Sequence, residues 1–341
     1  LMLESIAKAS QIDLETVRKS YMSLGDLGTV ATVALQEGSV GLKQFSIRLF
    51  QPYKPMLADI CDSVSDALHR HDNDTAFEYK YDGARIHIHK KGREVKIFSR
   101  RLTNVTDSLP DVAESAIAQI QAQESIVEGE VVAVAPDGKP LPFQDLMRRF
   151  RRIREVGVTA ANIPVKLFLF DIVFTDGKDL TNMPYQERWR LLSQVCPDIF
   201  LATRLLTKDP VEAQRFLEKA IEAGHEGLMA KRLDSPYTPG IRSGKWLKIK
   251  PADFLDLVIV AADWGSGRRR GWLSNYHLAA REEGANEFLE MGKTFKGLTD
   301  REFQEITDRL QEIKVDEDEY TVRVKPEIVV EVAFDEIQRS R

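Results

Sequence analysis

The first 45 residues carry apolar side chains at the three- and four-residue spacing of amphipathic helices. The series begins with Leu3, Ile6 and Ala7 and continues to Val30. This spacing predicts a helical segment over residues 1–45. So few residues bury too little apolar surface to fold alone, so we expect them to be the end of a larger helical domain.

Between residues 46 and 252 the apolar pattern alternates between the two-residue period of strands and the longer helical period. The first two predicted strands are joined near Asp82-Gly83. Strands and helices are mixed without a regular βαβ repeat, which indicates an α+β sheet domain. The predicted strands are 77–85, 86–90, 94–99, 125–135, 165–174, 227–231 and 246–250, and the predicted helices are 111–121, 143–156, 185–194 and 210–223.

The pattern changes after Pro251, where short strands predominate. A meander of short strands with one helix is typical of a small β-barrel, so we expect a further domain over 253–341. Its predicted elements are strands at 256–263, 276–281, 287–291, 320–324 and 327–334, a glycine-rich turn at 265–271 and a helix at 300–313.

The composition is that of an ordinary globular chain, with 43% hydrophobic and 30% charged residues, which excludes disordered and low-complexity classes. No apolar run approaches the roughly 18 residues of a membrane span, so we expect no membrane partner. Cys61 and Cys196 lie far apart and outside any metal-ligand spacing. Two such cysteines argue against a disulfide framework and fit a reducing cytoplasm.

The net charge of −5 does not indicate a nucleic-acid-binding protein, but the basic residues are clustered. Local clusters, rather than net charge, set the field that a polyanion meets. Solvation of an ordinary surface is the alternative explanation for any one cluster. The clusters are Arg148, Arg149, Arg151, Arg152 and Arg154; Arg268, Arg269 and Arg270; and Lys245, Lys248 and Lys250.

Lys80 ends an apolar strand and precedes a glycine turn, in the segment Glu78-Tyr79-Lys80-Tyr81-Asp82-Gly83-Ala84-Arg85. A lysine that is partly buried beside other cations loses part of its ammonium character and can act as a nucleophile. The glycine would let a phosphate approach the backbone. A surface lysine before an Asp-Gly hairpin turn is the alternative, and this segment alone does not decide between them.

Further charged motifs follow Lys80 along the chain. Because residues two apart in a strand share a face, Trp246, Lys248 and Lys250 are expected to project together. Glu128 and Glu130 likewise share a face, where a cation or ribose hydroxyls would relieve their repulsion. The other motifs are Ser99-Arg100-Arg101, Phe170-Asp171 and Glu226-Gly227-Leu228-Met229-Ala230-Lys231.

This ordered set resembles the covalent nucleotidyltransferases, which include polynucleotide ligases and messenger-RNA capping enzymes. Across nearly its whole length the chain is similar to the ATP-dependent DNA ligases of the archaeal and eukaryotic replicative type. The resemblance implies the end of a helical DNA-binding domain over 1–45, an adenylation domain with antiparallel sheets and flanking helices over 46–252, and an incomplete OB-fold domain over 253–341. The matching segments are 80–85, 99–109, 127–132, 167–171, 184–190, 226–231 and 243–250.

The resemblance also implies how ATP would be bound. Lys80 would attack the α-phosphate of ATP and hold AMP as a phosphoramidate. Glu78 would accept the adenine amino group, Phe170 would stack on the base, and Glu130 would bind the ribose hydroxyls and a metal-bound water. For Phe170 and Glu130, a core aromatic and an exposed strand carboxylate are the alternatives.

Cations would meet the phosphates. Arginine holds two oxygens at once, and Arg85 and Arg100 would contact phosphates of the nucleotide or the nick. Lys248 and Lys250 would neutralise the α-phosphate as charge builds on it. Arg242 matches a further nucleotide contact of the family.

The resemblance implies Mg²⁺ and nicked duplex DNA as partners. Glu226, with Glu130, would hold Mg²⁺, which prefers hard oxygen ligands. Arg148, Arg149, Arg151, Arg152, Arg268, Arg269 and Arg270 are the candidate DNA contacts. We expect a monomer in the cytoplasm, nucleoid-associated in an archaeon, that serves DNA replication, repair and recombination, with a sliding clamp as a further candidate partner.

Other activities share part of this pattern. An RNA ligase would prefer nicked RNA, and a capping-type guanylyltransferase would prefer GTP and would not need the helices before residue 46. A catalytically inert DNA-binding fragment would keep the basic clusters but would leave Lys80 without a role. An NAD-dependent ligase would carry a nicotinamide-recognition segment before Lys80, and residues 41–77 contain none that we recognise.

Both ends of the sequence look cut, and we expect a fragment. The family's final basic motif, which orients the pyrophosphate leaving group, would follow Arg341. We therefore expect this fragment to bind nucleotide but to adenylylate itself and seal nicks poorly.

Two other patterns are not interpreted as sites. His87 and His89 alternate on a strand, but a third metal ligand does not follow in the sequence. The segment 265–271 lacks the Gly-Lys-Ser/Thr ending of a Walker phosphate loop.

Overall fold

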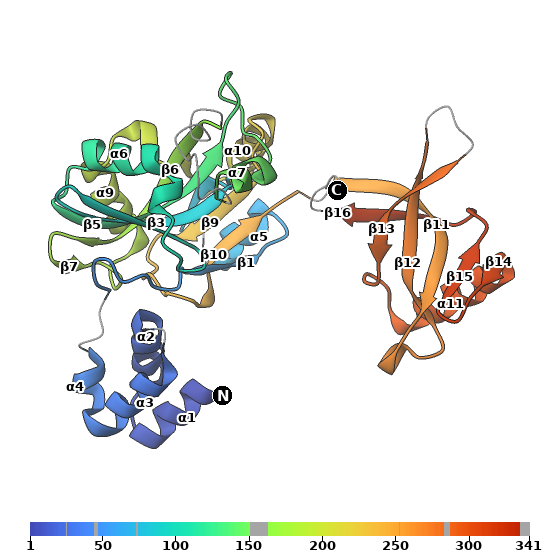
Figure 1. Ribbon diagram of the computed structural model, residues 1–341, viewed down its shortest axis with the longest axis horizontal. Helices are drawn as coiled ribbons and strands as arrows, with labels where there is room; N and C mark the ends of the chain where they lie inside the picture. Colours follow the sequence, from blue (N-terminus) through green and yellow to red (C-terminus); the bar gives the residue numbers. More distant parts are fainter. Residues whose placement is uncertain are drawn as a thin grey trace. The chain divides into compact units, whose positions relative to one another are not determined.

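The computed structural model divides the chain into two compact units, Leu1–Pro251 and Ala252–Arg341 (Figure 1). The division falls one residue before the predicted boundary between 252 and 253. No helix among the described residues has the length and apolar character that a membrane crossing requires. The structure describes residues 1–24, 26–43, 47–72, 74–150, 163–251, 253–282 and 287–334.

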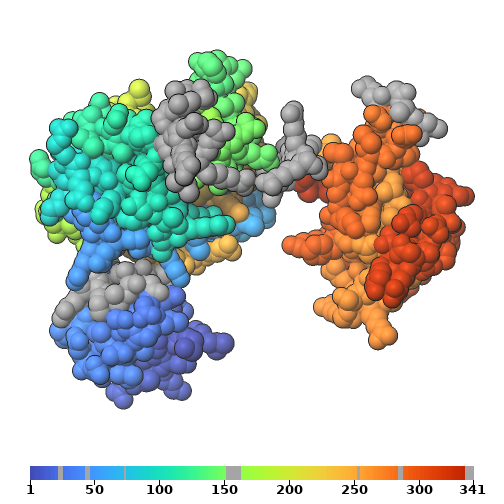
Figure 2. Space-filling model, in the orientation of Figure 1, coloured from blue at the N-terminus to red at the C-terminus, as the bar shows by residue number. Residues whose placement is uncertain are grey.

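The chain begins with short helices, as the apolar spacing predicts, and Figure 2 shows them as a compact lobe. Their contacts surround a small core that includes Ala7, Val17, Val30, Ala34 and Leu42. The helices are α1 (Met2–Ser10), α2 (Leu14–Leu24), α3 (Leu27–Gln36) and α4 (Gly38–Lys43).

The first sheet of unit 1 has the strand order β1-β10-β9-β2-β8, and its pairs are antiparallel except the parallel pair β1 and β10. Helices α5 (Val64–Arg70) and α10 (Pro210–Glu222) cover one face, where Leu68 and Leu217 pack against Phe77. The strands are β1 (Leu57–Ile60), β2 (Thr75–Tyr79), β8 (Arg204–Leu206), β9 (Leu228–Arg232) and β10 (Arg242–Ile249).

The second sheet has the order β4-β3-β5-β6-β7 with antiparallel pairing throughout. One face packs on α6, α7 and α9 through a core that includes Val112, Leu146 and Leu192. The strands are β3 (Ala84–Lys91), β4 (Glu94–Ser99), β5 (Glu124–Ala133), β6 (Val165–Thr175) and β7 (Lys178–Asp179); the helices are α6 (Pro110–Gln119), α7 (Phe143–Phe150) and α9 (Tyr185–Val195), with 3₁₀ turns η1 (Thr106–Ser108) and η2 (Asp198–Phe200). The predicted α+β class is confirmed.

The other faces of the two sheets share a core that includes Met56, Tyr81, Phe170 and Trp246. The chain crosses from one sheet to the other between β2 and β3. The connection therefore lies near Asp82-Gly83 as predicted, but it is not the hairpin turn considered as the alternative, because β2 and β3 belong to different sheets. Gly83 is required at the crossing, since a Cβ there would lie 2.3 Å from the carbonyl oxygen of Val131.

Unit 2 is a curled antiparallel sheet of order β13-β12-β11-β15-β14, in which β16 also pairs with β11 (Figure 1). Helix α11 begins with a capping box of Thr299 and Glu302, and its Phe303 and Leu310 enter the core. The elements are β11 (Asp253–Trp264), η3 (Gly267–Arg269), β12 (Leu273–Arg281), β13 (Phe288–Thr294), α11 (Asp300–Glu312), β14 (Lys314–Glu317), β15 (Thr321–Val324) and β16 (Val329–Phe334).

Candidate active site

Lys80 is the first residue after β2 and is held at the crossing by main-chain hydrogen bonds. Its amide donates to the carbonyl of Gly227 over 2.8 Å, and its carbonyl accepts from the amide of Glu226 over 3.0 Å. Gly227 has φ +139°, and a Cβ there would lie 2.1 Å from the carbonyl oxygen of Ile249. Glycine at this position thus lets the segment before β9 lie against both Lys80 and β10.

Glu226 lies between two lysines. One of its carboxylate oxygens contacts the Lys80 ammonium and the other lies 2.5 Å from Nζ of Lys250, which follows β10. All three side chains are about one-quarter exposed, so the cluster is neither at the surface nor sealed from water. The structure thus brings together three residues that are far apart in the sequence.

The surroundings of Lys80 make its neutral form easier to reach than in an exposed lysine. Burial, reinforced by the positive charges of Lys250 and Lys248, lowers the pKa of Lys80 to about 8, although Glu130 and Asp82 act in the opposite direction. A useful fraction of the amine is therefore unprotonated near neutral pH. This is the property that a nucleophilic lysine needs.

Glu130 on β5 lies within electrostatic reach of the same lysine. Burial raises its pKa to about 7, even though the charges of Arg85, Lys80 and Arg100 oppose this shift. Glu130 pairs across the ladder with Arg85 of β3. A carboxylate with a raised pKa beside a lysine with a lowered pKa marks a candidate active site.

Glu226 and Glu130 suit a divalent cation by their chemistry. Among the described residues, no group of three or more His, Cys, Asp and Glu side chains could hold a metal ion by itself. Mg²⁺ usually takes one or two protein carboxylates together with substrate phosphates and waters. Glu226 and Glu130 fit this pattern as the protein ligands, with the nucleotide phosphates and waters supplying the rest.

Arg85 lies in the buried space between the sheets. Its guanidinium donates to Glu128 and to the carbonyl of Met56, both over 2.6 Å, and its Cζ lies 5.3 Å from the ring centres of Phe170 and Trp246. Nε of Arg85 and Nε1 of Trp246 are buried without a partner among the described residues. Two buried donors beside aromatic rings thus lack a partner among the described residues, which is uncommon in folded proteins.

Glu128 is fully buried and anchors this region. Burial alone would raise its pKa, but Arg85, His87 and the hydroxyl of Tyr237 lower it to about 2. Tyr53 and Tyr237 both donate to Oε1 of Glu128. Arg85 thus supplies the cation expected beside the paired carboxylates Glu128 and Glu130.

Glu78 and Phe170 lie deeper than the sequence suggests, at 2% and 9% exposure. Glu78 is bound by Lys231 over 2.7 Å and by the hydroxyl of Tyr185. Trp246 is also buried, although it shares a face with Lys248 as predicted, while Leu247 packs on the opposite side of β10. We call the buried residues Glu78, Phe170 and Trp246, together with the side chains that contact them, the floor of the site.

Two residues of this floor were missed by sequence reasoning. Lys231 and Tyr185 are fully buried and hold Glu78, but a lysine ending an apolar strand and a tyrosine opening a helix gave no signal of burial. Arg188 was missed too. It donates to Asp171 through Nε and Nη2 over 2.8 and 2.9 Å.

Two other predicted nucleotide contacts, Arg100 and Arg242, are exposed rather than buried between the sheets. Arg100 is exposed, and its amide donates to the carbonyl of Arg85 over 3.2 Å. Arg242 is exposed at the first residue of β10, at the opposite end of that strand from Lys248.

The arginines of α7 differ in their surroundings. Arg148 is 75% exposed and pairs with Asp145 over 3.1 Å. Arg149 is buried, contacts Asp111, and donates to the carbonyl of Ile163 over 3.1 Å. Its prediction as a DNA contact is therefore wrong, because its guanidinium anchors the helix internally. Arg151 and Arg152, also predicted as DNA contacts, lie outside the described residues.

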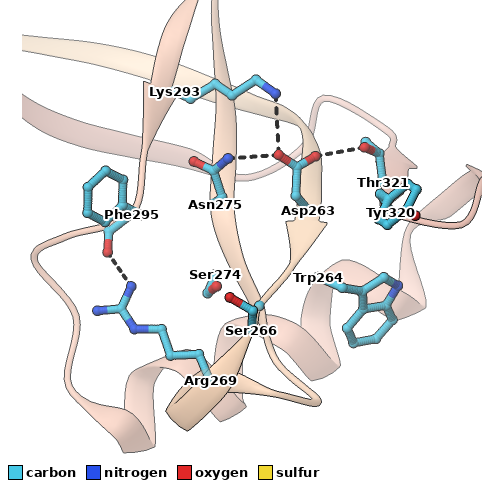
Figure 3. A pocket seen from close by; sticks show the side chains of 11 residues that line it. Asp263, Trp264, Ser266, Arg269, Ser274, Asn275, Lys293, Phe295, Tyr320 and Thr321 are labelled. Atoms are coloured by element: carbon cyan, nitrogen blue, oxygen red, sulfur yellow. Dashed lines mark hydrogen bonds and ion pairs between the residues drawn. The ribbon is translucent and has the colours of Figure 1, made fainter.

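Of the three adjacent arginines of unit 2, one lies at a hollow of about 710 Å³ (Figure 3). Arg269 lines it, donates to the carbonyl of Phe295 over 2.6 Å and stacks on Phe303. Arg268 and Arg270 are exposed, and Arg268 pairs with Asp300 over 2.6 Å. The exposed pair remains available to a polyanion.

The buried histidines have neutral rings. Burial lowers the pKa of His87 to about 4 and that of His89 to about 3. His87 stacks on Tyr53 with ring centres 4.4 Å apart, and Nδ1 of His89 accepts from the amide of Phe50 over 3.0 Å. Both rings therefore serve as packing groups in this structure.

The family model for the ATP dependent DNA ligase domain matches residues 55–250, and the model for the ATP dependent DNA ligase C terminal region matches residues 269–341. The chain belongs to the ATP-dependent DNA ligase family. The resemblance drawn from the motifs around Lys80 is thus confirmed.

Curated relatives match the whole of this chain. DNA ligase 1 of Korarchaeum cryptofilum is 46% identical over 341 residues, and the DNA ligase of Thermococcus fumicolans is 44% identical over 344 residues. The chain spans 62% of the length of each of these relatives. A solved structure, Pmar-Lig_PreS3, is 20% identical, with a TM-score of 0.55 over 88% of this chain and 66% of that one, and shares the fold.

Proposed function

We propose that the chain carries the ATP-dependent chemistry of a DNA ligase that seals nicks between a 5′-phosphate and a 3′-hydroxyl in duplex DNA. The observation that carries this proposal is the Lys80 ammonium, with its pKa lowered to about 8, in contact with Glu226 and beside the cations Lys250 and Lys248. Family membership supports the use of ATP and of DNA.

The reaction has three phosphoryl transfers. Unprotonated Nζ of Lys80 attacks the α-phosphorus of ATP, forms a phosphoramidate with AMP and releases pyrophosphate. The 5′-phosphate at the nick then attacks the same phosphorus and frees Lys80. Finally the 3′-hydroxyl attacks the activated 5′-phosphate, a phosphodiester forms, and AMP leaves.

The protein residues position the nucleotide and neutralise the charge on its phosphates. Lys248 and Lys250 oppose the charge that builds on the α-phosphate, while Arg85 and Trp246 offer unpaired donors beside Phe170. Glu226 and Glu130 would hold Mg²⁺, which neutralises phosphate charge when bound. Arg100 and Arg242 are the proposed contacts at the edge, and Glu78 is the proposed acceptor for the adenine amino group.

DNA would be held mainly through phosphates, by Arg148, Arg268 and Arg270 among the described residues, and read by shape rather than sequence. A sliding clamp is a further proposed partner, and we propose that the chain acts as a monomer. Both cysteines are free and buried, which supports a reducing cytoplasm as its location.

The test is to incubate the chain with Mg²⁺ and ATP labelled at the α-phosphate, beside Lys80→Ala, and to measure covalent AMP by intact mass. We expect a covalent AMP adduct on the wild type and none on Lys80→Ala, with slow adduct formation and poor sealing of nicked DNA. Sealing of nicked DNA that already carries AMP on its 5′-phosphate tests the last transfer independently of the first two. Preference for GTP would favour a capping enzyme, preference for nicked RNA an RNA ligase, and failure to bind ATP an inert DNA-binding fragment.

A further inference from the structure

The floor of the site contains a buried lysine that the three phosphoryl transfers do not use. Lys231 is 1% exposed. Its Nζ lies 2.7 Å from Oε2 of Glu78 and donates to the carbonyl of Phe170 over 3.1 Å. A charge buried this completely persists only with a counter-charge and hydrogen bonds, and Lys231 has both.

The surroundings of this ammonium are aromatic. Nζ lies 4.4 Å from the ring centres of Phe170 and Trp246 and 4.9 Å from that of Tyr185. The hydroxyl of Tyr185 donates to Oε1 of Glu78, so each oxygen of this carboxylate has one donor from the protein interior. A carboxylate offers about four lone-pair sites, so Glu78 can still accept from a ligand.

The sheet register fixes this arrangement. Lys231 lies opposite Ala76 on β2 and opposite Trp246 on β10, and Glu78 lies two residues beyond Ala76. Directly opposed residues, and those two apart, share a face of an antiparallel sheet. Lys231, Trp246 and Glu78 therefore project together toward the space between the two sheets.

The charge of Lys231 decides what kind of hydrogen bond Glu78 can make. An ionised carboxylate only accepts, whereas a protonated carboxyl also donates. A carboxylate that is 2% exposed and lacks a counter-charge is neutralised by a proton. An amino group at position 6 of a purine donates, and a carbonyl group at the same position accepts. The two purines are therefore told apart only while Glu78 remains ionised.

We propose that Lys231 is a positioning residue that sets the base selectivity of the nucleotide site, by keeping Glu78 an acceptor-only carboxylate that admits a 6-amino purine and rejects a 6-oxo purine. This inference rests on the proposed function, because it requires the base of the nucleotide to lie on this floor. It assigns to Lys231 an effect on substrate choice that is separate from the chemistry of Lys80.

The experiment compares binding of ATP and inosine triphosphate, which differ at position 6, by isothermal titration calorimetry of the full chain. The variants are Lys231→Met, which removes the charge at similar volume, and Lys90→Met as the matched control. Lys90 is a second buried lysine, 5% exposed, whose Nζ donates to the carbonyl of Ala122 over 2.7 Å, on the other sheet. Covalent AMP on Lys80 is recorded in parallel by intact mass.

We expect the wild type and Lys90→Met to prefer ATP by about tenfold or more, since a hydrogen bond to a charged group is at stake. Lys231→Met should lose most of this preference. The double variant Glu78→Gln with Lys231→Met removes both charges and should fold better than Lys231→Met, yet it should still fail to discriminate, because an amide both donates and accepts.

Two results would overturn the inference: a wild type that binds both nucleotides equally, or a neutral variant that folds and keeps the wild-type preference. The proposed function fails differently. In that case neither nucleotide binds the wild type, and no AMP appears on Lys80.

Discussion

The carbonyl of Lys80 accepts a hydrogen bond from the amide of Glu226, and the ammonium of the same lysine contacts the carboxylate of the same glutamate. The two residues are 146 positions apart in the chain. One residue is therefore bound to the other through both main chain and side chain. Their relative position depends on the pairing of β2 with β9 rather than on a flexible loop.

The rate of AMP transfer to Lys80 should rise with pH and level off above about 8. The reason is that only the unprotonated amine attacks, and the lowered pKa of Lys80 places its titration at about 8. Below that value the rate should fall about tenfold per pH unit. Single-turnover formation of the adduct, followed by mass at saturating ATP, measures this profile.

Lys250→Met should move the midpoint of that profile to higher pH. The substitution removes a cation that lowers the pKa of Lys80 and frees a Glu226 oxygen to stabilise the ammonium, and both changes raise the pKa. We expect a shift of about one unit. Lys245→Met, earlier on β10, is the control and should leave the midpoint in place. An unchanged midpoint in Lys250→Met would contradict this account of the lysine.

Arg149→Ala should destabilise unit 1 by about 2 kcal/mol, because it removes a buried guanidinium, which takes the cation from Asp111 and a hydrogen-bond donor from the carbonyl of Ile163. The figure is set below that of a fully buried pair because Asp111 is 44% exposed. Arg148→Ala, one residue earlier and exposed, should change stability by less than about 0.5 kcal/mol. Urea unfolding of the two variants makes the comparison, and equal effects would refute the distinction.

Removing Arg268 or Arg270 should weaken DNA binding most at low salt. If each contacts one phosphate, each substitution to Ala should reduce the slope of log affinity against log salt by about one. Arg309→Ala, an exposed arginine on α11, serves as the control. Fluorescence anisotropy with a nicked duplex across a salt series measures the slopes. Slopes that fall equally in the control would place the contact elsewhere.

Glu130→Gln should raise the Mg²⁺ concentration needed for half-maximal adduct formation by about tenfold or more, because an amide is a weaker ligand than a carboxylate. Chelation of Mg²⁺ should abolish the adduct. Glu124→Gln on the same strand removes a carboxylate that pairs with Lys91 over 2.8 Å near the surface, and should leave the requirement unchanged. A normal Mg²⁺ requirement in Glu130→Gln would assign that residue to the ribose alone.

Much of the fold follows from periodicity alone. The β4 bounds of Glu94–Ser99 match the predicted strand, and the ends of α10 differ from prediction by no more than one residue. In these segments, burial of one face dominates the pattern. By contrast β14, with the sequence Lys-Val-Asp-Glu, is exposed throughout and was missed because pairing with β15, rather than burial, makes it a strand.

The sequence predicted the site residues that stand in recognisable charged motifs. It did not predict the ion pairs that are buried in the folded protein. Lys80, Glu226 and Lys250 stand in motifs whose chemistry can be recognised from residue type and spacing. The pairing of Lys231 with Glu78 and of Arg188 with Asp171 depends on side-chain burial that spacing does not reveal. The prediction of Arg149 as a DNA contact was wrong for the same reason. A run of arginines predicts an exposed surface, but the side chain of Arg149 is buried.

Because Lys80 lies in the connection between β2 and β3, we expect substitutions far from the site to affect the position of this lysine. Residues before Lys80 are fixed by hydrogen bonds to β8 and β9, and those from Ala84 onward by bonds to β4 and β5. Lys80, the proposed nucleophile, therefore lies where the two sheets meet, and the side chains packed between the sheets set their spacing. Val132 and Met56 carry no charge and belong to the core between the sheets, so we expect a change of volume at either residue to shift Lys80 relative to Glu130. Natural variation in catalytic rate among such proteins can thus arise in the apolar interior, with every charged motif left intact.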